Sequence, residues 1–306
     1  MQKRRPVIKQ EDHVVLGMTA GLGAFFMFTV MNVFAKLLAE NHSVIEIAFY
    51  RNLVGSLPFL FMAFALGDRD ILVIRSKPWT VALRAIFGSI SLMITFLAFS
   101  LMPMADTTAL LFTSSLFIPV LGVLILKERV GPWRWSAVVI GFAGVLVMVN
   151  PSGDVYALGV SVALVAALMH ASLQLALRYL GGHERPETVT LYFFVIGTLV
   201  TALPLPFVIV APTWAEIPLV FGVGLSGAAA QWLLSTAFKN APAAIVTVFN
   251  YSGIVWATLF GWLIWSDWPL PSVFAGAAVV IASNILIIWR ESRVGKVTRP
   301  PRPGAE

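Results

Sequence analysis

The chain has 306 residues, of which 58% are hydrophobic and 12% are charged, and its mean hydropathy is +0.87. This composition excludes a soluble protein. The net charge of +6 comes from basic residues beside apolar stretches, which is typical of membrane topology and argues against nucleic acid binding. Cysteine is absent, so disulfides and thiolate metal sites are excluded.

Ten apolar stretches follow one another, and most reach the roughly 20 residues that a helix needs to cross a bilayer. We expect ten transmembrane helices, at 14–38, 44–66, 79–101, 104–126, 133–149, 156–179, 188–210, 215–238, 242–265 and 271–289. The predicted organisation is a cytoplasmic tail at 1–13, a first half at 14–149, an outer linker at 150–155, a second half at 156–290 and a disordered tail at 291–306.

Basic residues between the stretches fall only at alternate ends, beginning with the N-terminus. Lys3 lies in the first tail, Lys127 follows the fourth stretch and Arg290 follows the tenth, while the intervening connections contain no basic residue. Lysine and arginine are enriched in cytoplasmic loops. The pattern therefore predicts a multi-pass protein of the inner membrane with both termini in the cytoplasm.

The two halves of the chain match one another when the sequence is aligned with itself. In the register that places Gly88 on Gly227, Pro103 falls on Pro242 and Thr108 falls on Thr247. Because each half holds five predicted helices, an odd number, the second half must enter the membrane from the opposite side. Such an inverted repeat favours transport by alternating access, although a channel or a membrane enzyme could also arise by duplication.

Several short motifs resemble those of the drug/metabolite transporter superfamily, EamA type, over nearly the whole chain. They are Phe49-Tyr50-Arg51-Asn52, Leu83-Arg84-Ala85, Met102-Pro103-Met104-Ala105-Asp106 and Gly141-Phe142-Ala143-Gly144. The resemblance implies an all-α integral membrane fold of ten helices in two inverted five-helix repeats. It also implies a central cavity lined by helices 1, 3, 4, 6, 8 and 9, and transport of small organic metabolites.

Polar residues at membrane depth are costly and usually face the bundle interior or a water-filled cavity. The candidate substrate-binding residues are Thr113, Ser114, His170, Gln174, Gln231, Trp232, Asn250 and Tyr251. We expect them to converge on one cavity that suits a flat, partly apolar, polar-edged substrate. His170, with a reference pKa near 6.5, could carry a coupled proton; the alternative is a neutral histidine that is hydrogen-bonded inside the bundle.

Other polar residues are predicted to have structural or gating roles. Lys36 and Glu46 lie at similar depth near the outer ends of neighbouring helices and are expected to pair. Arg51 cannot remain unpaired in hydrocarbon, whereas Arg84, about one turn inside its helix, could extend its side chain to the interface. For both arginines the resemblance favours an architectural role over contact with substrate. Matching turns are expected at Pro103 and Pro242.

The sequence therefore predicts a secondary transporter for a small organic metabolite, an amino acid or a similar compound. A nucleoside-like or vitamin-like substrate is the first alternative, and a membrane-embedded enzyme or a channel is a weaker one. No catalytic constellation, metal-ligand spacing or cofactor motif is recognisable, so we expect neither metal nor cofactor. The expected partners are the substrate, the lipid bilayer and possible coupling protons, and no nucleic acid.

Overall fold

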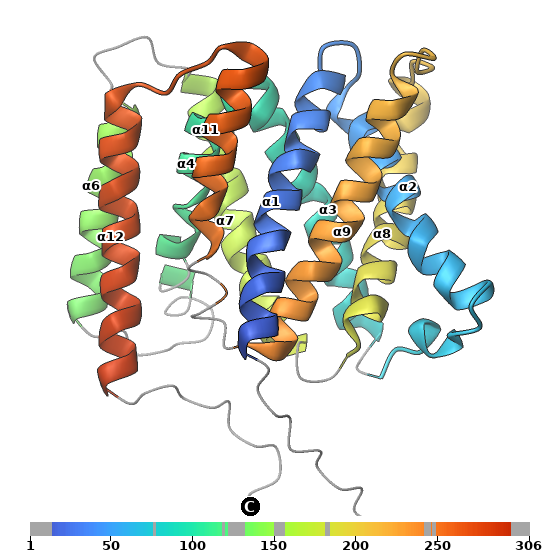
Figure 1. The fold of residues 1–306 in the computed structure, drawn as a ribbon, viewed down its shortest axis with the longest axis horizontal. Helices are drawn as coiled ribbons and strands as arrows, with labels where there is room; N and C mark the ends of the chain where they lie inside the picture. The colour runs from blue at the N-terminus through green and yellow to red at the C-terminus, as the bar shows by residue number, and fades with distance from the viewer. Residues whose placement is uncertain are drawn as a thin grey trace, which may run out of the picture.

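The computed structural model describes residues 14–75, 78–117, 120–121, 132–149, 157–180, 184–241, 246 and 249–294. Within these ranges the regular structure is entirely helical, with one α-helix in each of the ten predicted stretches (Figure 1). The helices are α1 (Val14–Leu38), α2 (Val44–Phe64), α3 (Pro78–Leu101), α4 (Met104–Leu111), α6 (Pro132–Val149), α7 (Ala157–Leu180), α8 (Pro186–Ala202), α9 (Ile217–Asn240), α11 (Ser252–Trp265) and α12 (Pro271–Val294).

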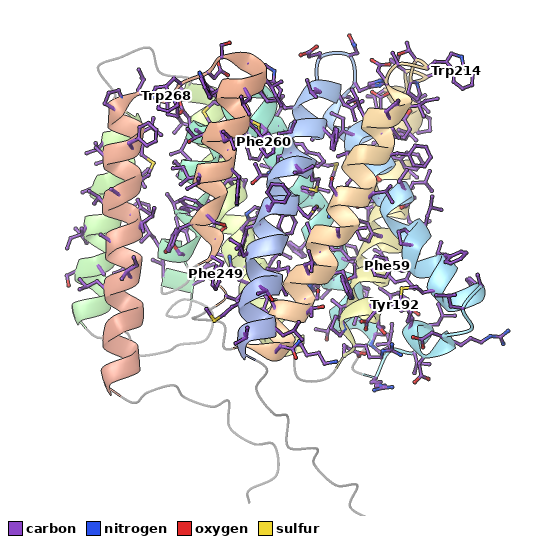
Figure 2. All side chains as sticks on the ribbon, in the orientation of Figure 1. Phe59, Tyr192, Trp214, Phe249, Phe260 and Trp268 are labelled. Carbon is purple, nitrogen blue, oxygen red and sulfur yellow. The ribbon has the colours of Figure 1, made fainter. Side chains whose placement is uncertain are left out.

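The lengths of these helices fit a membrane. Five of them, α1, α2, α3, α7 and α9, are long and apolar enough to cross a bilayer, and α6, α8, α11 and α12 contain shorter apolar helices. Trp214 is 90% exposed and Trp268 is 65% exposed. Figure 2 shows both at one end of the bundle, opposite the end where Tyr192 lies. Tryptophan at helix ends is typical of the membrane interface.

The bundle is built from pairs of helices that come from different halves of the chain. The main contacts join α1 to α9, α3 to α7, α2 to α8, α4 to α11, and α6 to α12. The α6–α12 pair forms one edge of the bundle, α4 and α11 come next, and α1 begins at the same end of the bundle where α12 finishes (Figure 1).

These contacts are reciprocal when α1, α2, α3 and α4 are matched with α7, α8, α9 and α11. The α1–α9 contact then corresponds to α7–α3, and α2–α9 corresponds to α8–α3. In the same way α1–α11 corresponds to α7–α4, and α2–α3 to α8–α9. For these four pairs of contacts, exchanging the halves therefore returns another contact that the structure contains.

Small residues allow the α6–α12 pair to approach closely. A Cβ atom added to Gly144 on α6 would lie 2.8 Å from the carbonyl oxygen of Gly276 on α12, and one added to Gly276 would meet the carbonyl of Gly144. Since a backbone carbonyl cannot move aside cheaply, both positions require glycine. Close backbone approach through small residues is a common way to join helices in a membrane.

Four predicted helix boundaries were wrong. The stretches 104–126 and 242–265 were expected to be continuous, but α4 ends at Leu111 and α11 begins only at Ser252. The predicted helix 188–210 ends at Ala202 and is followed by a short 3-10 helix, Leu205–Phe207. At the other extreme, α12 continues to Val294, so residues 291–294 are helical rather than part of the expected tail.

Candidate functional site

The breaks in the fourth and ninth predicted helices face each other. Phe112 and Thr113 form a turn after α4, and the chain is helical again at 114–117; Tyr251 forms a turn just before α11. The rings of Phe112 and Tyr251 meet edge to face, with centroids 5.3 Å apart. In the repeat register, defined as the one that places Gly88 on Gly227, Phe112 corresponds to Tyr251. The two breaks thus occupy matching positions of this sequence register and are in contact.

Hydroxyl groups satisfy the carbonyls at these breaks. Thr113 Oγ1 donates to the Leu110 carbonyl at 2.8 Å, and Ser252 Oγ donates to the Phe249 carbonyl at 2.6 Å. These two bonds also correspond in the repeat register. Backbone groups freed inside a membrane need such partners. Thr113 and Ser114 are fully buried, and the proton of the Thr113 hydroxyl is committed to the backbone rather than available to a substrate.

His170, on α7, pairs with a residue that the sequence analysis did not select. Its Nε2 lies 3.1 Å from Thr95 Oγ1 on α3, and the same hydroxyl donates to the Ser91 carbonyl at 2.8 Å. Because a threonine hydroxyl has one proton, the imidazole Nε2–H must be the donor in this pair. The four-residue spacing of Ser91 and Thr95 places both on one helix face, and this spacing was the sequence signal that could have indicated the partner of His170.

The other predicted polar residues divide into two settings. Gln174, Gln231 and Asn250 are buried or partly buried, and among the described residues no hydrogen bond joins any of them to His170. Trp232 is 39% exposed, and its indole Nε1 donates to Glu187 Oε1 at 3.2 Å. Trp232 therefore belongs to a group at the start of α8.

An aromatic cluster joins α1 to α11. The ring of Phe26 meets the ring of Trp256 edge to face, with centroids 5.1 Å apart, and it also contacts Phe260. Two buried polar atoms on the same two helices, Trp256 Nε1 and Asn32 Oδ1, have no partner within the described part of the chain. A flat apolar wall with an available donor and an available acceptor is suited to a ring-bearing ligand.

The expected pair of Lys36 with Glu46 is wrong. Lys36 Nζ donates to the Met102 carbonyl at 2.9 Å, lies 5.1 Å from the Trp265 ring, and faces the carboxylates of Asp106 and Asp267. Lys36 instead connects the end of α1 to the turn before α4, because that turn brings a carbonyl within reach. Pro103 precedes α4, and its carbonyl accepts from the Thr107 backbone at 3.0 Å. Pro242 lies outside the described residues.

Glu46, at the start of α2, binds the second half of the chain. Its Oε1 accepts from the Val210 backbone at 2.6 Å and lies 3.3 Å from His42 Nδ1. His42 Nε2 in turn lies 3.4 Å from Glu216 Oε2, just before α9. We name this group the Glu46 clasp; its members are Asn41, His42, Glu46, Val210, Thr213 and Glu216.

A second clasp lies beyond the opposite end of α2. Arg185, just before α8, binds Asp68 through two hydrogen bonds of 3.0 and 2.9 Å. This bond to Arg185 lowers the pKa of Asp68. The Arg75 backbone donates to Glu184 at 2.8 Å. We name these residues, Asp68, Arg75, Glu184 and Arg185, the Asp68 clasp. Glu46 lies at the start of α2 and Arg185 lies just before α8, so each half contributes one clasp from the start of its second helix.

Arg51 and Arg84 lie deep in the bundle. Arg51 is 1% exposed and its Nη1 donates to Asn52 Oδ1 at 2.9 Å, with its guanidinium 4.3 Å from the Phe194 ring centroid. Arg84 could have extended to the interface by its position in the sequence, but it is only 5% exposed and lies 5.5 Å from the Phe193 ring centroid. Stacking against this ring holds the Arg84 side chain inside the bundle.

Comparison with known families decides the class of the protein. The profile of the EamA-like transporter family matches the chain twice, over residues 15–150 and 157–289. The chain belongs to the EamA-like transporter family. The resemblance predicted from the motifs is confirmed, and this EamA-like chain is a multi-pass membrane protein.

Several curated relatives of the EamA-like chain are named as transporters. A pseudopaline exporter of Pseudomonas aeruginosa is 28% identical over 279 residues, covering 90% of this chain and 97% of the relative. A riboflavin transporter of Rhizobium johnstonii is 31% identical over 237 residues, covering 77% and 78%. An S-adenosylmethionine uptake transporter of Rickettsia prowazekii is 24% identical over 266 residues, covering 87% and 90%.

A solved crystal structure shares the fold. It superposes with a TM-score of 0.65 at 17% identity and covers 92% of the EamA-like chain and 98% of its own chain. At this identity the likeness establishes the arrangement of the helices and nothing about the substrate.

The second and seventh predicted helices carry a match that the sequence analysis missed. Tyr50, Gly55 and Leu57 fall on Tyr192, Gly197 and Leu199 in a register of their own, in which Arg51 corresponds to Phe193. A Cβ atom at Gly88 would meet the Phe193 ring, and one at Gly227 would lie 2.8 Å from Arg51 Nε. Because these two helices depart from the repeat register of the rest of the chain, a single alignment of the halves hid this signal.

We predict that the Glu46 clasp stabilises the fold in a pH-dependent way. Hydrogen bonds from Thr213 and Asn41 lower the pKa of Glu216 to about 2. Since a lowered carboxyl pKa contributes stability above the unfolded value of about 4.3, Glu216→Gln should lower the thermal midpoint at pH 7. The difference from the native chain should shrink as the pH falls below about 4.

Thermal unfolding of the purified chain between pH 7 and pH 3.5 measures this difference. Asp70→Asn is the matched control, because Asp70 is 67% exposed and forms only a 3.5 Å pair with Arg75. It should leave the midpoint nearly unchanged. A Glu216→Gln difference of equal size at both ends of the pH range would contradict the predicted role of the Glu216 charge.

Proposed function

We propose that this EamA-like chain is a secondary transporter that moves a small organic metabolite across the inner membrane by alternating access. In this proposal the two five-helix halves are inverted repeats, and both termini lie in the cytoplasm. The observation that carries the proposal is that the two helix breaks, at Phe112-Thr113 and at Tyr251, match in the repeat register and contact each other through the rings of Phe112 and Tyr251.

Three further observations support the inverted repeat. The family profile matches each half separately. Helix contacts between the halves are reciprocal, and so are the hydrogen bonds of Thr113 and Ser252 and the glycine contacts of Gly88 and Gly227. Two repeats that can exchange conformations open one site to each side of the membrane in turn.

The broken helices favour a transporter over a rigid membrane enzyme. Discontinuous helices near the bilayer midplane commonly form the substrate sites of secondary transporters. The relatives of this chain are named as transporters of pseudopaline, riboflavin and S-adenosylmethionine. We propose that Ser114, Gln231, Asn250 and Tyr251, together with the His170–Thr95 pair, contact the substrate.

Two substrate classes are consistent with this site. An amino acid or similar metabolite suits the His170–Thr95 pair and the separate amide of Asn250. A vitamin-like or nucleoside-like metabolite is favoured by the aromatic cluster of Phe26, Trp256 and Phe260, whose flat surfaces suit a ring. Two of the relatives are named for ring-bearing compounds, riboflavin and S-adenosylmethionine.

Counterflow in liposomes tests the proposed mechanism and the site together. Liposomes containing the purified chain and loaded with unlabelled riboflavin, S-adenosylmethionine or an amino acid mixture should accumulate the labelled form of one of them. His170→Ala, Gln231→Ala and Asn250→Ala should each lower the rate by about tenfold, since one lost hydrogen bond corresponds to roughly 1.4 kcal/mol. If His170 carries a coupled proton, its replacement should also flatten the pH profile between about 5.5 and 7.5.

Ser161→Ala is the matched control for these variants. Ser161 lies on the same helix as His170 but is exposed and bonds its own backbone, so its replacement should leave counterflow intact. Equal counterflow in all three alanine variants at equal expression would exclude the site. Labelled uptake that does not depend on the internal load would indicate a channel.

The proposed orientation has its own test. The chain contains no cysteine, so single cysteines can be introduced without background labelling. Trp214→Cys should react with an impermeant thiol reagent in intact cells, and Asp70→Cys should react only after the membrane is opened. Both positions are exposed in the structure, which makes them a balanced pair. The reverse labelling pattern would contradict cytoplasmic termini.

A further inference from the structure

Buried hydrogen-bond donors gather between α2, α3 and α8 without acceptors. Arg51 Nε, Arg84 Nε and Asn52 Nδ2 are buried and have no partner in the described residues. The two arginines are 1% and 5% exposed and Asn52 is fully buried. These three atoms are all N–H donors, and the other unpartnered atoms on the same helices, Ser91 Oγ and Thr188 Oγ1, belong to hydroxyls that can also donate. The chemical complement of such a group is a ligand that only accepts hydrogen bonds.

The charges of the two arginines are also uncompensated by the described part of the chain. Its ion pairs involve neither Arg51 nor Arg84, and Arg84 forms no hydrogen bond there. A buried charge without a counter-ion is strongly unfavourable, and arginine at membrane depth usually pairs or marks a substrate path. Packing alone leaves this cost unbalanced.

Aromatic rings orient both guanidinium groups. Arg51 lies 4.3 Å from the Phe194 centroid and 5.1 Å from the Phe193 centroid, and Arg84 lies 5.5 Å from the Phe193 centroid. Stacking on a ring occupies the face of a guanidinium. Its N–H groups lie in the plane and point outward, so stacking leaves them available to an anion. The Arg51–Asn52 hydrogen bond uses the only acceptor of the Asn52 amide and leaves its NH₂ group free.

The fold brings these groups together from opposite ends of the bundle. Arg51 follows the start of α2, and Arg84 follows the start of α3, which begins at the other end. Both nevertheless contact the same Phe193 ring. Glycines make the arrangement possible, because a Cβ atom at Gly88 would collide with Phe193 and one at Gly227 would lie 2.8 Å from Arg51 Nε.

We propose that Arg51, Arg84 and Asn52 bind a carboxylate group of the transported metabolite. A planar carboxylate matches the paired N–H groups of a guanidinium and forms short, charge-assisted hydrogen bonds with it. The site assigns a substrate class, small organic anions, to the transporter proposed above and rests on that function only for transport of the ligand. Binding itself requires no transport.

Benzoate and benzamide are matched probes for this site. They share a flat ring, but only benzoate carries a carboxylate. At constant ionic strength in sodium chloride, benzoate should raise the thermal midpoint of the purified chain saturably, by about 2 °C at ten times its dissociation constant. Benzamide should produce no saturable shift.

Substitutions of Arg84 test whether the arginines cause the benzoate-induced shift in the thermal midpoint. Arg84→Lys keeps the charge but loses the paired N–H geometry, and it should weaken benzoate binding by about tenfold; Arg84→Gln should abolish binding. Arg69→Gln, which replaces an exposed arginine outside both clasps, should bind benzoate as the native chain does. The lysine variant provides the comparison if the glutamine variant does not fold.

The outcomes are separable from those of the transport assay. No saturable benzoate shift in the native chain, equal shifts from benzoate and benzamide, or undiminished benzoate binding in Arg84→Lys would each overturn the carboxylate site. None of these results bears on counterflow of other substrates. Conversely, a failure of counterflow with normal benzoate binding would contradict the proposed function and leave the binding site standing.

Discussion

A polar group inside a bilayer must find its partner within the protein, because lipid offers none. This constraint explains most of the local structure of the chain. Where the fourth and ninth predicted helices break, Thr113 and Ser252 supply hydroxyl donors to the carbonyls of Leu110 and Phe249. Lys36 donates a hydrogen bond to the carbonyl of Met102, just after the end of α3. The charged residues at the two ends of α2 are joined to the second half by the two clasps.

Because buried polar groups need partners within the protein, buried polar atoms without a partner are informative. Buried polar atoms that keep no partner among the described residues occur on several helices, α1, α2, α3, α4, α8, α11 and α12. They include the Trp256 indole beside an aromatic wall and the donors around Arg51 and Arg84. In a protein that carries small molecules, such atoms are suited to be satisfied by the cargo. The two groups differ in chemistry, since one offers a flat aromatic surface and the other offers guanidinium and amide N–H donors.

The sequence predicted the fold more completely than the site. Apolar length and the alternation of basic residues indicated ten helices, and each predicted stretch contains one. Composition could not reveal the breaks, because both stretches are apolar overall and their polar residues, such as Thr113 and Asn250, can also occur within a continuous helix. Partners were harder still, because they lie far away in the chain. Glu46 accepts from the backbone of Val210, and Arg84 meets the ring of Phe193.

Alternating access is tested most directly by measuring both clasps in the same preparation. Spin-label pairs can span each clasp, at Glu40 and Trp214 for the Glu46 clasp and at Val73 and Glu184 for the Asp68 clasp. In lipid, with and without transported substrate, we predict two distance populations for each label pair. The distance across one clasp should be long only when the distance across the other clasp is short. A single unchanged distance at both clasps, or lengthening of both together, would contradict alternating access.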